Sequence, residues 1–141
     1  MRAKVEAAGL RGRIEVDSAG TGSWHQGSAP DERAIGEALR RGIELTSRAR
    51  QVHAGDFAYF DLLVAMDHAN EADLLDLAPT AADRTKVRLL RQWDPHAHEH
   101  AVALDVPDPY YGGPSGFADM FDLIDAACAG LLQHTLAALD R

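Results

Sequence analysis

The apolar run FDLLVAM, residues 60–66, is the feature that most constrains the fold of this chain. A continuous apolar run of this length is typical of a parallel strand that is buried on both faces. It is followed by HANEADLLDLAP, which has the composition of a helix that Pro79 ends, and then by a second short apolar run, KVRLL. Strands that alternate with helices predict an α/β layer fold with a parallel sheet.

The flanking segments extend this pattern. Residues 1–10 predict the end of a helix, with Gly9 and Gly12 as stop signals, and residues 14–16 predict a short strand that runs into a glycine turn. Residues 28–42 predict a helix with Ser28 as its N-cap and Pro30 near its first turn. A long closing helix is expected from Ser115 onward, because apolar residues recur there at spacings of four and three.

Composition limits the functional classes. The 141 residues are enough for one domain, residues 1–141, and 14 basic against 22 acidic residues give a net charge of -8. An acidic chain without a basic run does not favour binding to nucleic acid. We expect no membrane association, since the sequence shows neither a spanning apolar stretch nor a charged-then-apolar leader. The single cysteine fits a reducing cytoplasm.

Polar loops follow the predicted strands. In parallel sheets ligands bind at the carboxyl ends of the strands. DSAGTGSWHQG follows the first predicted strand, MDHAN follows the second, and DVPDPYYGG lies downstream of the third. We therefore expect one rim to gather the polar and aromatic residues of these loops, namely Asp17, Ser18, Trp24, Asp67, Asp108, Tyr110 and Tyr111.

Three segments, VDSAGTGSWHQGSAPDERA, RARQVHAGDFAYFDLLVAMDHAN and DVPDPYYGG, resemble successive parts of the low-molecular-weight protein tyrosine phosphatases, in order and in spacing. The resemblance covers nearly the whole chain, and DVPDPYYGG is its most specific motif. It implies a small doubly wound parallel sheet, phosphotyrosine phosphatase I-like and Rossmann-like, with three layers. It also implies a cysteine phosphatase that hydrolyses phosphotyrosine on proteins or small aryl phosphates, with no metal and no other cofactor.

The same resemblance implies roles for the acid loop. Asp108 corresponds to the general acid, Trp24 and Tyr110 to the walls around the substrate ring, and Tyr111 to the next residue of that loop. An acid is needed because phenol keeps its proton up to a pKa of about 10 and leaves poorly as phenolate. Protonating the bridging oxygen can contribute roughly 10²–10⁴-fold. Taken alone, DPYY would also fit a turn-capping aspartate beside packed tyrosines.

The nucleophile of this chemistry has no counterpart in the 141 residues. Members of the family begin with a strand and a Cys-x5-Arg loop, whose backbone N–H groups and arginine hold the phosphate. Here the single cysteine is Cys128, the residue six positions later is His134, and Cys128 lies on the apolar stripe of the last predicted helix. We expect Cys128 to be a buried structural thiol. We also expect the first strand and the phosphate loop to be missing, with residues 1–10 as the second half of the following helix.

Two further readings are weaker. HAHEH places His96, His98 and His100 at alternate positions, which suits a metal if the segment is extended and suits a solvated loop otherwise. The second interpretation is preferred, and no metal site is predicted. Arsenate reduction on the same fold would require further cysteines for a thiol relay, and the sequence has none.

Two hypotheses of different classes follow. The chain is the body of a tyrosine phosphatase whose start lies upstream, inactive as given, or it is a short non-catalytic module that binds phosphorylated or aromatic ligands. The complete acid loop favours the first, and an in-frame Cys-x5-Arg segment upstream of Met1 would support it. By the resemblance, the missing strand belongs between residues 14–16 and 62–66, so we expect a marginally stable chain that self-associates through unpaired strands.

Overall fold

The computed structural model describes residues 1–22, 27–97, 104–108 and 115–141. Helices and two short strands alternate along this part of the chain. In order they are α1 (Arg2–Ala7), α2 (Glu32–Arg40), α3 (Gly55–Tyr59), β1 (Leu63–Ala65), α4 (His68–Leu77), α5 (Ala81–Arg84), β2 (Val87–Leu89), the 3-10 turn η1 (Leu90–Trp93) and α6 (Gly116–Leu139).

The two strands form a parallel pair, with Leu63 opposite Val87 and Ala65 opposite Leu89. Because side chains alternate along a strand, these four residues share one face of the pair. They are buried against Phe57 of α3 and Leu74 of α4. The buried runs of the sequence therefore form parallel strands, as predicted, although each strand is shorter than its apolar run.

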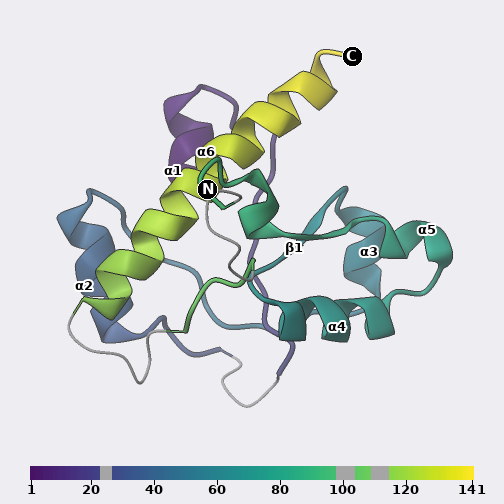
Figure 1. The fold of residues 1–141 in the computed structure, drawn as a ribbon, viewed down its shortest axis with the longest axis horizontal. Helices are drawn as coiled ribbons and strands as arrows, with labels where there is room; N and C mark the ends of the chain where they lie inside the picture. Colours follow the sequence, from purple (N-terminus) through teal and green to yellow (C-terminus); the bar gives the residue numbers. More distant parts are fainter. Residues whose placement is uncertain (23–26, 98–103, 109–114) are drawn as a thin grey trace.

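The opposite face packs against α6. Leu62 and Val64 lie in a second core with Leu90, Ala127 and Leu131. Gly130 allows α6 and η1 to approach closely, since a Cβ at this position would lie 1.9 Å from the carbonyl oxygen of Trp93. Figure 1 shows α6 with α1 and α2 on one side of β1, and α3, α4 and α5 on the other. This mixed α/β arrangement around a small parallel sheet confirms the predicted fold class.

The helix predicted for residues 28–42 starts later than expected. Asp31, not Ser28, is the N-cap of α2, and its carboxylate accepts a hydrogen bond from the backbone N–H of Arg33 at 2.8 Å. Ser28 cannot begin the helix because its carbonyl oxygen accepts the N–H of Ala49, 2.8 Å away. Pro30 consequently precedes the cap. The helix ends near Gly42, whose φ of +75° suits the left-handed position after a helix.

Residues 14–16 are not a strand in the structure, which corrects the prediction. The N–H of Ile14 closes a turn onto the carbonyl of Leu10 at 2.9 Å, and the carbonyl of Val16 accepts the Nε–H of Arg2 at 2.9 Å. A strand is defined by a ladder of bonds to a neighbour, and among the described residues β1 pairs with β2 alone. The nearest equivalent is one isolated parallel bridge between Gly20 and Gln51.

The last helix, α6, and the first helix, α1, form where the sequence predicts them. α6 spans 24 residues and buries Ala127, Cys128, Leu131 and Leu132. α1 ends at Ala7, and Gly9 follows with a φ of +70°, as its stop signal predicts. In the described part of the chain, no helix combines the length and the apolar character that crossing a bilayer requires.

Candidate functional site

The predicted acid loop is fixed to the carboxyl end of β1. The N–H of Val106 donates to the carbonyl oxygen of Met66, directly after the strand, at 2.7 Å. The Val106 side chain is 8% exposed and joins the core beneath α6. Asp108 lies two residues further along and is exposed. The candidate acid is therefore a solvent-facing carboxyl on a segment that is held at its base.

The start of α4 forms the second contact with this segment. The carboxylate of Asp105 accepts the backbone N–H of His68 at 2.9 Å and lies 2.6 Å from its ring Nδ1. These two hydrogen bonds, from the backbone N–H first and the ring second, lower the pKa of Asp105 below its usual value. Arg91 of η1 donates to the carbonyl oxygen of Asp105 at 3.1 Å. Asp105 is therefore bound both by His68 of α4 and by Arg91 of η1.

Asp67, which the sequence placed at the ligand rim, has a structural contact. It is the N-cap of α4, and its carboxylate accepts the N–H of Asn70 at 2.7 Å. Asp17 is also bound to neighbours: its carboxylate accepts the N–H of Ser18 at 2.8 Å and the Nε–H of Arg50 at 3.2 Å. Both carboxylates thus bind neighbouring protein groups in the structure, and their place at a ligand rim stays a prediction.

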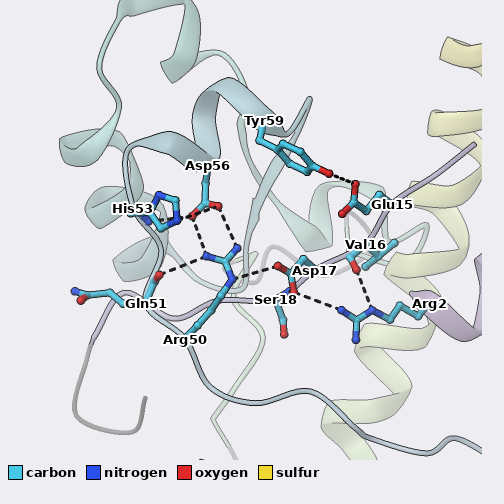
Figure 2. Close-up of polar contacts among 10 residues, drawn as sticks. All are labelled: Arg2, Glu15, Val16, Asp17, Ser18, Arg50, Gln51, His53, Asp56 and Tyr59. Atoms are coloured by element: carbon cyan, nitrogen blue, oxygen red, sulfur yellow. Dashed lines mark hydrogen bonds and ion pairs between the residues drawn. The ribbon is translucent and has the colours of Figure 1, made fainter. Parts of the chain in front are cut away.

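Arg50 is the centre of a charged network that connects two distant parts of the chain. Figure 2 shows its guanidinium between Asp56 of α3 and Asp17. Both terminal nitrogens reach the Asp56 carboxylate at 3.1 Å, the bidentate geometry in which arginine binds carboxylates most strongly. The Asp56 side chain is 7% exposed, and it also accepts the N–H of His53 at 2.9 Å.

The pKa of Asp56 reflects two opposing effects. Burial raises the pKa, while the hydrogen bonds from Arg50 and from the His53 N–H, together with the charge of Arg50, lower it. The net result is a pKa below the ordinary value, so the carboxyl is ionised at neutral pH. The same pairing with Asp56 raises the pKa of Arg50. This network fixes the parallel bridge, since the N–H of Gly20 donates to the carbonyl of Arg50 at 2.8 Å.

Two further polar contacts extend the network toward residues 15–17 (Figure 2). The hydroxyl of Tyr59 donates to the carboxylate of Glu15 at 2.6 Å, which raises the pKa of Tyr59. Arg2 reaches Asp17 at 3.4 Å in addition to the carbonyl of Val16. Of these contacts, the bond from Arg2 to the carbonyl of Val16 satisfies a backbone group that a neighbouring strand would otherwise bind.

Cys128 lies on α6, where it is 4% exposed and packs in the core with Leu90, Val106 and Leu131. The prediction that it is a buried thiol is confirmed. Within the ranges that the structure describes, no group of three or more histidine, cysteine, aspartate or glutamate side chains is arranged to hold a metal ion. Two histidines of HAHEH, His98 and His100, lie outside those ranges.

Several predicted site residues also lie outside the described residues. These are Trp24 and Tyr110, expected to wall the substrate ring, and Tyr111, the next residue of the acid loop. Their roles stay predictions. Sequence reasoning in turn missed Arg50, Asp56, His68 and Asp105. The signals for them were weak: an arginine six residues before an aspartate, and a histidine and an aspartate that are 37 residues apart.

The comparison with protein families decides the identity of the fold. The family model described as low molecular weight phosphotyrosine protein phosphatase matches residues 1–141. This chain belongs to that family.

Individual relatives agree with this assignment. A low molecular weight protein-tyrosine-phosphatase from Streptomyces coelicolor is 48% identical over 134 residues, which cover 93% of this chain and 79% of the relative. Low molecular weight protein-tyrosine phosphatase A from Mycobacterium bovis is 46% identical over 123 residues, covering 87% of this chain and 72% of that protein.

A solved structure gives the same result in three dimensions. The crystal structure of a protein tyrosine phosphatase from Entamoeba histolytica, with Hepes in its active site, matches with a TM-score of 0.87 and 31% identity. The match covers 97% of this chain and 85% of that one. The phosphatase family predicted from three sequence segments is thus confirmed over the whole chain.

Proposed function

We propose that this chain is the body of a phosphatase that, once joined to a Cys-x5-Arg segment, hydrolyses phosphotyrosine in proteins or small aryl phosphates through a cysteinyl-phosphate intermediate, with Asp108 as the general acid. One observation carries the assignment of the acid: the segment of Asp108 is bound to the carboxyl end of β1 through Val106 and Met66. Ligands of parallel α/β sheets bind at this edge. A thiolate attacks phosphorus, the bond to the phenol oxygen breaks, and Asp108 gives that oxygen its proton.

The aromatic residues complete this proposal. Trp24 and Tyr110 wall the cleft around the substrate ring, and Tyr111 extends the same loop; the family resemblance supports these roles. A planar aryl group between aromatic rings gains apolar contact that an alkyl phosphate lacks. The reaction needs no metal or other cofactor, because the thiolate and the acid supply its covalent and proton-transfer steps.

The attacking thiolate is not supplied by residues 1–141. The single cysteine, Cys128, is a buried residue of α6 that is 4% exposed, so a phosphate ester cannot reach its sulfur. We therefore propose that the 141-residue polypeptide by itself hydrolyses p-nitrophenyl phosphate no faster than buffer. Turnover that persists after repeated purification, and that Asp108→Asn abolishes, would contradict this statement.

A form that carries the nucleophile tests the acid. Joining a strand and Cys-x5-Arg loop to the N-terminus should create activity against p-nitrophenyl and phenyl phosphate. In this form Asp108→Asn should lower turnover of phenyl phosphate by about 10²-fold. Asp73→Asn, on the exposed side of α4, is the matched control and should change nothing. An unchanged rate for Asp108→Asn would disprove the acid role.

The alternative is a phosphatase-like module that binds phosphorylated or aromatic ligands without catalysis. It predicts that the 141-residue chain binds a phosphotyrosine peptide, whereas the catalytic proposal assigns phosphate binding to the Cys-x5-Arg segment. Titration calorimetry with such a peptide separates the two, since binding by the 141-residue chain favours the module. We place either form in the cytoplasm, where the single thiol suits a reducing environment.

We also propose that the 141-residue chain self-associates through strand edges. In the described residues β1 pairs with β2 alone, and residues 14–16 make no ladder. Unpaired backbone groups at a strand edge can bind another chain. The midpoint of urea unfolding should then rise with protein concentration. A steep transition at one midpoint from micromolar to millimolar protein would refute this proposal.

A further inference from the structure

The contact between His68 and Asp105 joins two segments that are far apart in sequence. His68 is the first residue of α4, and Asp105 lies three residues before Asp108. One carboxylate oxygen of Asp105 takes both the backbone N–H of His68 at 2.9 Å and the ring Nδ1 contact at 2.6 Å. Solvent screens this pair, because the side chains of His68 and Asp105 are 54% and 44% exposed, so the contact is no stronger than an ordinary hydrogen bond.

The surrounding contacts show what the pair does. Val106 is held by Met66 and by the core, and the carbonyl oxygen of Asp105 is held by Arg91. Beyond this point Pro107 and Asp108 are exposed. The direction in which the chain leaves toward Asp108 is therefore set at residues 105 and 106. His68 holds the side chain at the first of these residues.

The helix does not need the ring for its own start. Asp67 already caps α4 through the N–H of Asn70. The backbone N–H of His68 belongs to the first turn, where such groups need a partner from outside the helix, and Asp105 provides one. That backbone bond needs the N–H alone, so any residue other than proline could form it at position 68. The Nδ1 contact depends on the side chain, so it can be removed separately.

We propose that His68 is a positioning residue, which holds the acid loop against the carboxyl end of β1 through Asp105 and so aims Asp108 at the leaving oxygen. The inference rests on the proposed function, because it assumes that Asp108 is the acid. A general acid must come within about 2.6–3.2 Å of the oxygen that it protonates. A displacement of about 1 Å can cost about 10²-fold in rate. His68 acts on the reaction only through Asp105.

The first test uses the 141-residue chain and needs no activity. Amide hydrogen exchange at Val106 reports whether the base of the loop is closed, since this N–H is bonded to Met66. His68→Ala should speed this exchange about fivefold, the factor for one lost hydrogen bond of ordinary strength. His68→Asn, whose side-chain amide can donate from near the Nδ1 position, should restore protection. Asp73→Asn on the same helix should leave the exchange unchanged.

A double-mutant cycle shows whether the two side chains act together. If His68 works through Asp105, adding His68→Ala to Asp105→Ala should speed exchange no further. Additive effects of the two substitutions, or unchanged exchange in His68→Ala, would overturn the proposal.

The second test uses the form that carries a Cys-x5-Arg segment. His68→Ala should lower turnover of phenyl phosphate about tenfold and that of p-nitrophenyl phosphate less than about threefold, because only the poorer leaving group depends on the acid. Equal losses for both substrates would mean that His68 is merely structural. If Asp108→Asn shows no dependence on the leaving group, the proposed acid is wrong. If Asp108→Asn shows it and His68→Ala does not, this inference alone fails. Should that form be inactive, the exchange cycle decides.

Discussion

Two regions of this phosphatase are held together in different ways. β1 and β2 share a backbone ladder over a core that includes Phe57 and Leu74. Residues 14–20 have one bridge among the described residues, to Gln51, and their side-chain polar contacts include those with Arg2, Arg50 and Tyr59. Asp56 and Phe57 are adjacent in α3, yet the first binds Arg50 and the second fills the core of the ladder region.

This contrast has an energetic meaning. The stabilisation from apolar burial does not depend on pH, whereas that from a partly buried ion pair depends on both partners staying charged. Removing one partner of a buried pair leaves an uncompensated charge, which is why such a loss is large. We call β1, β2 and their core the ladder region, and residues 14–20 with Arg50 and Asp56 the polar region. The stability of the polar region should therefore fall in acid, whereas that of the ladder region should not. Substitutions in each region can test this difference.

The largest effect is expected in the ladder region. Phe57 is 0% exposed, and Phe57→Ala should lower the free energy of unfolding by about 4 kcal/mol through lost burial and the cavity that remains. Urea unfolding at pH 7 measures the change. Leu77→Ala on α4 is the control, since Leu77 is exposed and should cost less than about 1 kcal/mol. Similar losses for the two variants would mean that the ladder core is not the main support.

The next effect is in the polar region. Arg50→Ala should cost about 3 kcal/mol, because it leaves the Asp56 carboxylate buried without its charged partner. Hydrogen exchange should accelerate first at Gly20 and Val52, whose N–H groups form the bridge bonds near Arg50. Arg40→Ala is the matched control: Arg40 pairs with Glu37 at 2.9 Å but is 71% exposed, and should cost less than about 1 kcal/mol. If hydrogen exchange accelerated equally in β1 and β2, the two regions would not be stabilised separately.

Acidification should have a smaller effect on the free energy of unfolding. The pKa of Asp56 in the folded protein lies below its ordinary value of about 3.9. The ionised carboxyl therefore stabilises the fold when the pH is above about 3.9. That contribution is lost as the pH falls through the lowered folded pKa. The stability difference between the native chain and Arg50→Ala should therefore begin to narrow as the pH falls below about 3.9, and should narrow further as it passes through the lowered folded pKa. The Phe57→Ala difference should stay constant, and a parallel decline in both would contradict the comparison.

The smallest effect concerns the link between Tyr59 and Glu15. Tyr59→Phe removes the hydroxyl that donates to the carboxylate at 2.6 Å and keeps the ring. The contact is exposed to solvent, so the loss of stability should be smaller than that of Arg50→Ala. Thermal unfolding of this variant beside Glu15→Gln measures it. A loss as large as that of Arg50→Ala would show that this link, and not the Arg50 pair, holds residues 14–16.

The sequence by itself determined the features that depend on neighbouring residues. Patterns of nearby residues predict the apolar stripe of α6, the apolar run that contains β1, and the glycine that follows α1. The structure confirms all three. Three spaced segments also sufficed for the family, which the match over residues 1–141 confirms. Local patterns are enough here because periodicity and turn residues act within a few positions.

Only the tertiary structure decided which distant groups meet. Residues 14–16 have strand-forming composition, but a strand needs a ladder partner, and the carbonyl of Val16 binds Arg2 instead. The Arg50–Asp56 pair and the His68–Asp105 contact join groups whose residue types are common and whose separation carries no period. Their meeting depends on how helices and strands pack, because a charged side chain pairs with whichever partner the fold brings within reach.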